Sequence, residues 1–99
     1  MKPYYAVIFT SVLTEQTEGY ETMAVAMETL AKKQPGFLGF ESARNELGIS
    51  VSYWESEQAI LDWKQQLDHL KAQALGKSKW YDRYTIRICK VEREYSFSR

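Results

Sequence analysis

The stretch QPGFLGFESARNELGISVSYWES, residues 34–56, predicts a β-hairpin placed between two helices. Pro35 and Gly36 end the preceding helix, because proline cannot continue a helix and glycine turns freely. Residues 37–43 (FLGFESA) and 49–54 (ISVSYW) are rich in strand-forming side chains, and the five residues between them (RNELG) are typical of a turn. The hairpin therefore sets the middle of the fold.

The second strand of this hairpin alternates cleanly between two faces. One face carries Ile49, Val51 and Tyr53, and the other carries Ser50, Ser52 and Trp54. Because successive side chains of a strand point to opposite sides, two small hydroxyl residues lie beside a tryptophan on one face. Ser56 follows the strand and is typical of a helix N-cap, with acidic neighbours that favour the positive end of a helix.

The residues before the hairpin predict one strand and one helix. Residues 20–33 carry apolar side chains three and four positions apart, the pattern of an amphipathic helix, and end in two lysines that suit a helix C-terminus. Residues 4–10 (YYAVIFT) are apolar at consecutive positions. This pattern indicates a strand that is covered on both faces.

The residues after the hairpin predict a second helix. Apolar side chains at Ala59, Ile60, Trp63, Leu67 and Leu70 again recur at helical spacing. Asp68 is a candidate cap for a new short turn that begins at His69, so this segment is either one helix or two.

A long final strand is predicted over residues 83–95 (RYTIRICKVEREY). Its apolar positions change parity between Ile88 and Val91, which indicates either a β-bulge or a change of partner strand.

The predicted order is thus β-α-β-β-α-β, a ferredoxin-like α+β plan with a four-stranded antiparallel sheet and both helices on one face. A single domain is expected over residues 1–99, with its core at about residues 4–95, since the chain leaves no room for a second core. The first strand is apolar on both faces, so the sheet face without helices needs cover from a partner chain.

The composition excludes several classes of protein. Thirteen basic and thirteen acidic residues give zero formal net charge without a basic stripe, which argues against nucleic-acid binding. The apolar stretches are too short for a signal peptide or a membrane-spanning helix, so we expect a cytoplasmic protein that does not bind membranes. No cluster of histidine, cysteine and carboxylates has metal-ligand spacing. The only cysteine, Cys89, is expected to be a small buried hydrophobe.

Four motifs together resemble the antibiotic biosynthesis monooxygenase family. Residues 35–39 (PGFLG) match the opening of that family's second strand, and residues 54–56 (WES) match its junction between third strand and second helix. Trp63 then follows in the helix, and His69 lies where many such domains carry a histidine. The spacing agrees from about residue 5 to residue 91.

The resemblance implies a homodimer in which two sheets form one α/β barrel. It also implies a cofactor-independent monooxygenase that acts on a small aromatic or quinol-type compound, whose deprotonated form supplies the electron to oxygen. A branch of the family binds and degrades haem, but its ligand histidine would fall near Gln73, and Thr10 and Ser11 do not match the asparagine of its first strand. Haem binding is therefore disfavoured, and no cofactor is expected. The alternative is a non-catalytic barrel that binds a small apolar ligand.

Candidate site residues follow from chemistry and from the resemblance. His69 and Trp63 are the candidate catalytic residues, because His69 is the only imidazole in the chain and an indole can donate a hydrogen bond. The candidate pocket residues are Trp54, Ser52, Ser50, Trp80 and Tyr84. A structural role stays open for each of them: His69 as a surface residue and the tryptophans as core aromatics. Likewise Arg44, Arg83 and Arg87 are each either a solvated charge or, if one of them points inward, a binder of phenolate.

Overall fold

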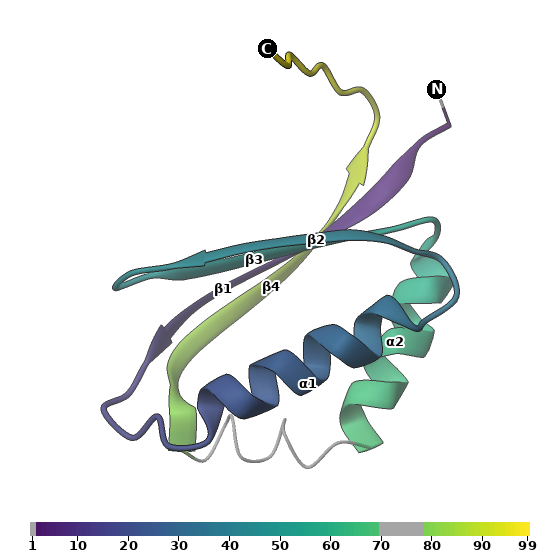
Figure 1. Ribbon diagram of the computed structural model, residues 1–99. Coiled ribbons are helices and arrows are strands. Elements are labelled where there is room, and N and C mark those ends of the chain that lie inside the picture. The colour runs from purple at the N-terminus through teal and green to yellow at the C-terminus, as the bar shows by residue number, and fades with distance from the viewer. Residues whose placement is uncertain (1, 70–78) are drawn as a thin grey trace.

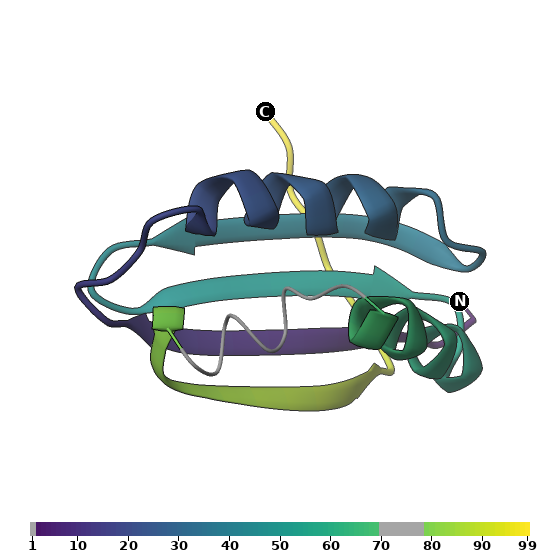
Figure 2. The same ribbon diagram turned by 90° about the horizontal axis from the view of Figure 1, so that it is seen from below.

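The computed structural model describes residues 2–69 and 79–99, and for Asp68 and His69 it describes the backbone alone. The element order is β1 (Tyr4–Leu13), α1 (Tyr20–Lys32), β2 (Phe37–Arg44), β3 (Gly48–Trp54), α2 (Glu57–His69) and β4 (Tyr81–Val91). The strands form one antiparallel sheet in the order β2-β3-β1-β4. Both helices lie on the same face of the sheet, α1 along β2 and α2 across one end (Figures 1 and 2). The predicted ferredoxin-like plan is confirmed.

Strand register decides which side chains face the helices. Phe9 of β1 lies opposite Ser50 of β3 on one side and Ile86 of β4 on the other. Directly opposed residues of antiparallel strands point to the same face, so these three side chains share the helix-facing side. Val7 and Ser52, two positions along, share it as well.

The core lies where α2 meets the hairpin. Trp54 is fully buried and packs with Ala31, Ala59 and Ile60. The Ser56 hydroxyl accepts a hydrogen bond from the backbone N–H of Ala59 at 3.1 Å, which confirms the predicted N-cap. This cap fixes the direction in which α2 leaves β3.

Gly36 allows α2 to approach the turn that precedes β2. Its φ is +85°, a left-handed conformation, and a Cβ atom at this position would lie 2.7 Å from the Cβ of Ala59. The Gly36 carbonyl also accepts a hydrogen bond from the N–H of Glu55 at 2.8 Å. Only glycine combines this backbone conformation with so close a contact.

Several details differ from the sequence-based expectations. β1 continues to Leu13, and β4 runs from Tyr81 to Val91 instead of over residues 83–95. β4 stays paired with β1 along its whole length, so no change of partner occurs. The register shift lies at the start of β4, opposite Val12 and Leu13, and not between Ile88 and Val91. Val91 simply belongs to the opposite sheet face from Ile88. In addition, α2 continues through Asp68, without the break considered there.

The sheet face opposite the helices carries Ile8, Val51, Arg87 and Cys89. Cys89 is exposed, so the expectation that it is buried is wrong for this chain: nothing in the described residues covers that face. Beyond Val91 the chain leaves the sheet as an extended tail (Figure 1).

Candidate functional site

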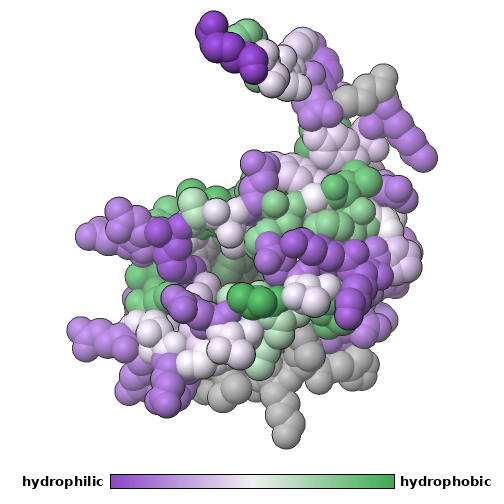
Figure 3. Space-filling view, in the orientation of Figure 1, coloured by the Kyte–Doolittle hydropathy of each residue, from purple (hydrophilic) through white to green (hydrophobic). Residues whose placement is uncertain are grey.

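A pocket of about 210 Å³ lies between the helix-facing side of the sheet and the two helices. Figure 3 shows a hollow in the surface between the sheet and α1, with apolar residues at its edge. Strands β1 and β3 contribute Val7, Phe9, Ser50 and Ser52, and all four helix-facing positions follow from the register above. The pocket is therefore built within one chain.

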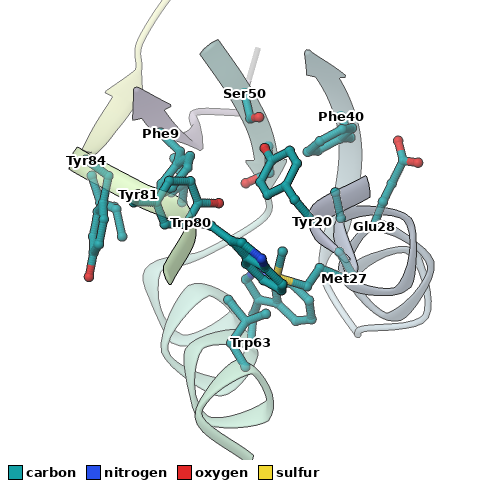
Figure 4. Close-up of a pocket in the computed structure, with 16 residues that line it drawn as sticks. Phe9, Tyr20, Met27, Glu28, Phe40, Ser50, Trp63, Trp80, Tyr81 and Tyr84 are labelled. Atoms are coloured by element: carbon teal, nitrogen blue, oxygen red, sulfur yellow. The ribbon is translucent and has the colours of Figure 1, made fainter. Parts of the chain in front are cut away.

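Aromatic rings form one side of this pocket (Figure 4). Phe9 stacks on Tyr84 with ring centroids 5.4 Å apart and meets Tyr81 edge-on, also at 5.4 Å. Tyr20, at the start of α1, contacts Tyr81 at 6.0 Å and Trp80 at 5.8 Å, both edge-on. Such a wall offers ring faces and edges to a flat aromatic ligand.

Two of the described indole N–H groups are already used inside the protein. Trp54 Nε1 donates to the Ser52 hydroxyl at 2.9 Å, and Trp80 Nε1 donates to the backbone oxygen of Glu18 at 2.9 Å. Trp63 Nε1, in contrast, has no acceptor among the residues that the structure describes. Trp63 itself lines the pocket.

The predicted site residues fall into three groups. Trp63, Ser50, Ser52, Trp80 and Tyr84 all line the pocket. Trp54 does not: it is completely buried behind the pocket and stacks on Trp63 with ring centroids 5.9 Å apart. His69 is the last residue of α2, and the position of its side chain lies outside what the structure describes.

Several lining residues were not predicted from sequence. Tyr20, Phe9 and Phe40 line the pocket, as does Glu28. Phe9 could have been found from the alternation of side chains along β1. A β1 residue that lies opposite a serine of β3 points to the same face of the sheet as that serine. Glu28, whose carboxylate lies 4.0 Å from Lys32 one turn along α1, carries the one carboxylate in the described lining.

Tyr81 contributes a hydroxyl that stays protonated. Burial raises the pKa of Tyr81 above its usual range, and the neighbouring Tyr20 raises it further through charge repulsion and a hydrogen bond. Arg44 opposes part of this effect with its positive charge. A phenol that keeps its proton at neutral pH is available as a hydrogen-bond donor.

Metal-binding geometry is absent from the side chains that the structure describes, those of residues 2–67 and 79–99. Within these ranges no three histidine, cysteine, aspartate or glutamate side chains are grouped so that they could hold an ion. Over the same ranges, no helix is both long enough and apolar enough to cross a membrane.

A family model described as antibiotic biosynthesis monooxygenase matches residues 3–75. The chain belongs to this family. A related chain, the uncharacterized protein YqjZ of Bacillus subtilis (strain 168), is 48% identical over 97 residues, which cover 96% of this chain and 85% of that one.

Several solved structures share the fold at low sequence identity. PA3566 from Pseudomonas aeruginosa gives a TM-score of 0.73 at 16% identity and covers 96% of this chain and 98% of its own. SnoaB from Streptomyces nogalater, described as a cofactor-independent oxygenase, gives a TM-score of 0.69 at 12% identity with both chains fully covered. At such identities the likeness concerns the fold alone.

Proposed function

We propose that this protein is a cofactor-independent monooxygenase for a small phenol or quinol with one or two rings. The observation that carries this proposal is the aromatic-walled pocket of about 210 Å³ within a single chain. An apolar cavity of about 150 Å³ is large enough for benzene, so this pocket suits one or two fused rings better than three. Family membership supports the reaction type, since SnoaB is described as a cofactor-independent oxygenase.

The reaction needs no electrons beyond those of the substrate. A phenol that has lost its proton transfers an electron to O₂, and the two radicals combine to a peroxide at a ring carbon that carries hydrogen. Loss of water from this peroxide leaves a carbonyl, so that phenol plus O₂ gives quinone plus water. The protein must hold the ring away from water and stabilise the negative charge that forms on oxygen.

Described residues are available for both tasks. Phe9, Tyr84 and Trp80 supply apolar ring surface. The Trp63 N–H is the proposed hydrogen-bond donor for the developing charge. The Ser52 hydroxyl, which accepts the Trp54 hydrogen bond, still has its own proton to donate. His69 as general base remains a prediction from the sequence.

We further propose that the protein acts as a homodimer that packs through the helix-free sheet face. Members of the family are commonly dimeric. That face carries Arg87 on β4 and Glu41 on β2, the two outer strands of the sheet. A twofold axis parallel to the strands would place β4 of one chain over β2 of the other and pair these opposite charges.

Oxygen consumption with a panel of phenols, quinols and three-ring anthrones tests the enzyme. One- and two-ring compounds should be turned over faster than anthrones. Trp63→Phe keeps an aromatic ring but removes the N–H, and it should lower turnover by about two orders of magnitude. Tyr95→Phe, in the exposed tail, is the control and should match the wild type. Absence of oxygen uptake with the whole panel would count against the oxygenase.

A second candidate function is a module that binds a small aromatic ligand without turning it over. The observation that favours it is the scarcity of bases: Glu28 is the one carboxylate in the described part of the lining. In this case Trp63→Phe would weaken ligand binding while the wild type consumes no oxygen.

A further inference from the structure

The guanidinium of Arg44, an exposed residue at the end of β2, is held next to the pocket by hydrogen bonds. Its Nη1 donates to the backbone oxygen of Ser11 at 3.3 Å, and its Nη2 donates to the Ser11 hydroxyl. Ser11 is itself completely buried in β1. Two hydrogen bonds from one guanidinium to a buried residue define its position far better than a single surface contact does.

Gly48 provides the space that this guanidinium occupies. A Cβ atom at Gly48, the first residue of β3, would overlap the guanidinium group of Arg44. Gly48 does not have a positive φ, so its backbone places no demand on glycine. The missing side chain at Gly48 therefore matters here for the room it leaves to Arg44.

Tyr20 connects Arg44 to the apolar pocket. Nη2 of Arg44 donates to the Tyr20 hydroxyl at 3.3 Å, and Cζ lies 5.5 Å from the centre of the Tyr20 ring. Tyr20 lines the apolar pocket on one side and, on the other, a more polar recess that Arg44 also lines. In Figure 4 the Tyr20 hydroxyl points toward the strand that carries Ser50. The Tyr20 hydroxyl thus links the aromatic pocket to the guanidinium of Arg44.

The positive charge of Arg44 is not neutralised by a neighbour in the described part of the chain. No carboxylate among those residues lies within 4.0 Å of it, and the ion pair found there joins Lys32 and Glu28 instead. A ligand oxygen that accepts a hydrogen bond from Tyr20 would lie about 6 Å from the guanidinium. At that distance one negative charge on the ligand gains an attraction large enough to change affinity at least about tenfold.

We propose that Arg44, acting through the Tyr20 hydroxyl, selects ligands that carry a negatively charged oxygen on an aromatic ring. The ring would occupy the aromatic pocket, and its phenolate or carboxylate oxygen would accept from Tyr20, with the Tyr81 phenol beside it. The proposal rests on the pocket of the proposed function but not on its oxygen chemistry. Selection of the anion would also promote the deprotonation that the oxygen chemistry needs, because a phenol that binds more tightly as an anion has a lower pKa when bound.

Calorimetric titration with 2-naphthoate and its neutral analogue 2-naphthamide at pH 7 tests this selection. The wild type should bind naphthoate at least about tenfold more tightly than naphthamide. Arg44→Met removes the charge, and Gly48→Ala keeps the charge but displaces the guanidinium, so both should abolish the preference. Arg93→Met, which removes an arginine from the exposed tail, is the matched control and should keep it.

A second arm separates phenolate from carboxylate. The affinity for 2-naphthol should rise with pH through the range in which naphthol itself ionises, and Arg44→Met should remove this rise. Equal affinities for naphthoate and naphthamide in the wild type would overturn the proposal. So would an anion preference that persists in folded Arg44→Met and Gly48→Ala proteins. Arg44-dependent binding by a protein that consumes no oxygen would contradict the proposed oxygenase function, while the proposed selection of anionic ligands would stand.

Discussion

Replacing Gly36 with alanine should destabilise the protein through two separable effects. The left-handed φ of +85° costs an L-residue about 1–2 kcal/mol. The new Cβ would lie 2.7 Å from the Cβ of Ala59, an overlap that typically costs about 1–3 kcal/mol. Alanine also restricts the unfolded chain, which returns about 0.4–1 kcal/mol. The net loss should be about 2–4 kcal/mol.

Urea unfolding of two further variants separates these effects. Ala59→Gly removes the atom that Gly36→Ala would strike, so in that background the substitution should cost only about 1 kcal/mol, the conformational part less what alanine returns through the unfolded chain. Gly39→Ala is the matched control, because its Cβ would meet its nearest neighbour, Tyr53, at an ordinary 3.6 Å. It should be as stable as the wild type or more stable by up to about 1 kcal/mol, because alanine restricts the unfolded chain.

Two results would refute this reasoning. One is a Gly36→Ala protein as stable as the wild type. The other is a loss of the same size in the Ala59→Gly background, which would show that the contact with α2 plays no part. Gly36→Ala should also weaken ligand binding, since Trp63 lies one helical turn beyond Ala59 and follows any shift of α2.

Two further predictions concern pH and assembly. Burial raises the pKa of Tyr81 in the folded protein, so the unfolded chain loses this proton first. Stability should therefore be full below about pH 10, the ordinary tyrosine value, and fall as pH rises above it, and Tyr81→Phe should reduce the fall measured by urea titration. Arg87→Glu should shift the protein from dimer to monomer in light scattering, and an equimolar mixture with Glu41→Arg should restore dimers. A wild-type monomer at micromolar concentration would contradict the dimer.

The strand pattern of the hairpin predicted much of the site. Alternation in ISVSYW placed Ser50 and Ser52 on one face, and the structure shows that this is the face that the helices cover. The end of β4 was harder to predict, because residues 92–95 continue a strand-like alternation. A strand, however, needs a partner for its hydrogen bonds. Val91 pairs with Tyr4, the first residue of β1, and there the pairing ends.

Tyr20 and Arg44 could not be assigned to the site from local pattern. Tyr20 continues the apolar stripe of α1, and Arg44 begins a polar turn, so each fits an ordinary structural role. Their contact depends on the pairing of β2 with β3, which places Arg44 opposite Gly48, and on the position of α1 over the sheet. Contacts between residues so far apart in the chain leave no periodic pattern in the sequence.

The motifs that carried the family resemblance meet in space, and this limits what they say about chemistry. Gly36, from the PGFLG motif, accepts a hydrogen bond from Glu55 of the WES motif and touches Ala59, one turn before Trp63. These residues set the distance of α2 from the sheet and so fix the position of Trp63 in the pocket lining. The residues proposed to choose the ligand, Tyr20, Arg44 and Gly48, lie outside both motifs. Two chains that share the motifs can therefore share the pocket and still differ in the charge of the ligand they accept, which makes the naphthoate preference, and not the family match, the measurement that defines this protein's substrate.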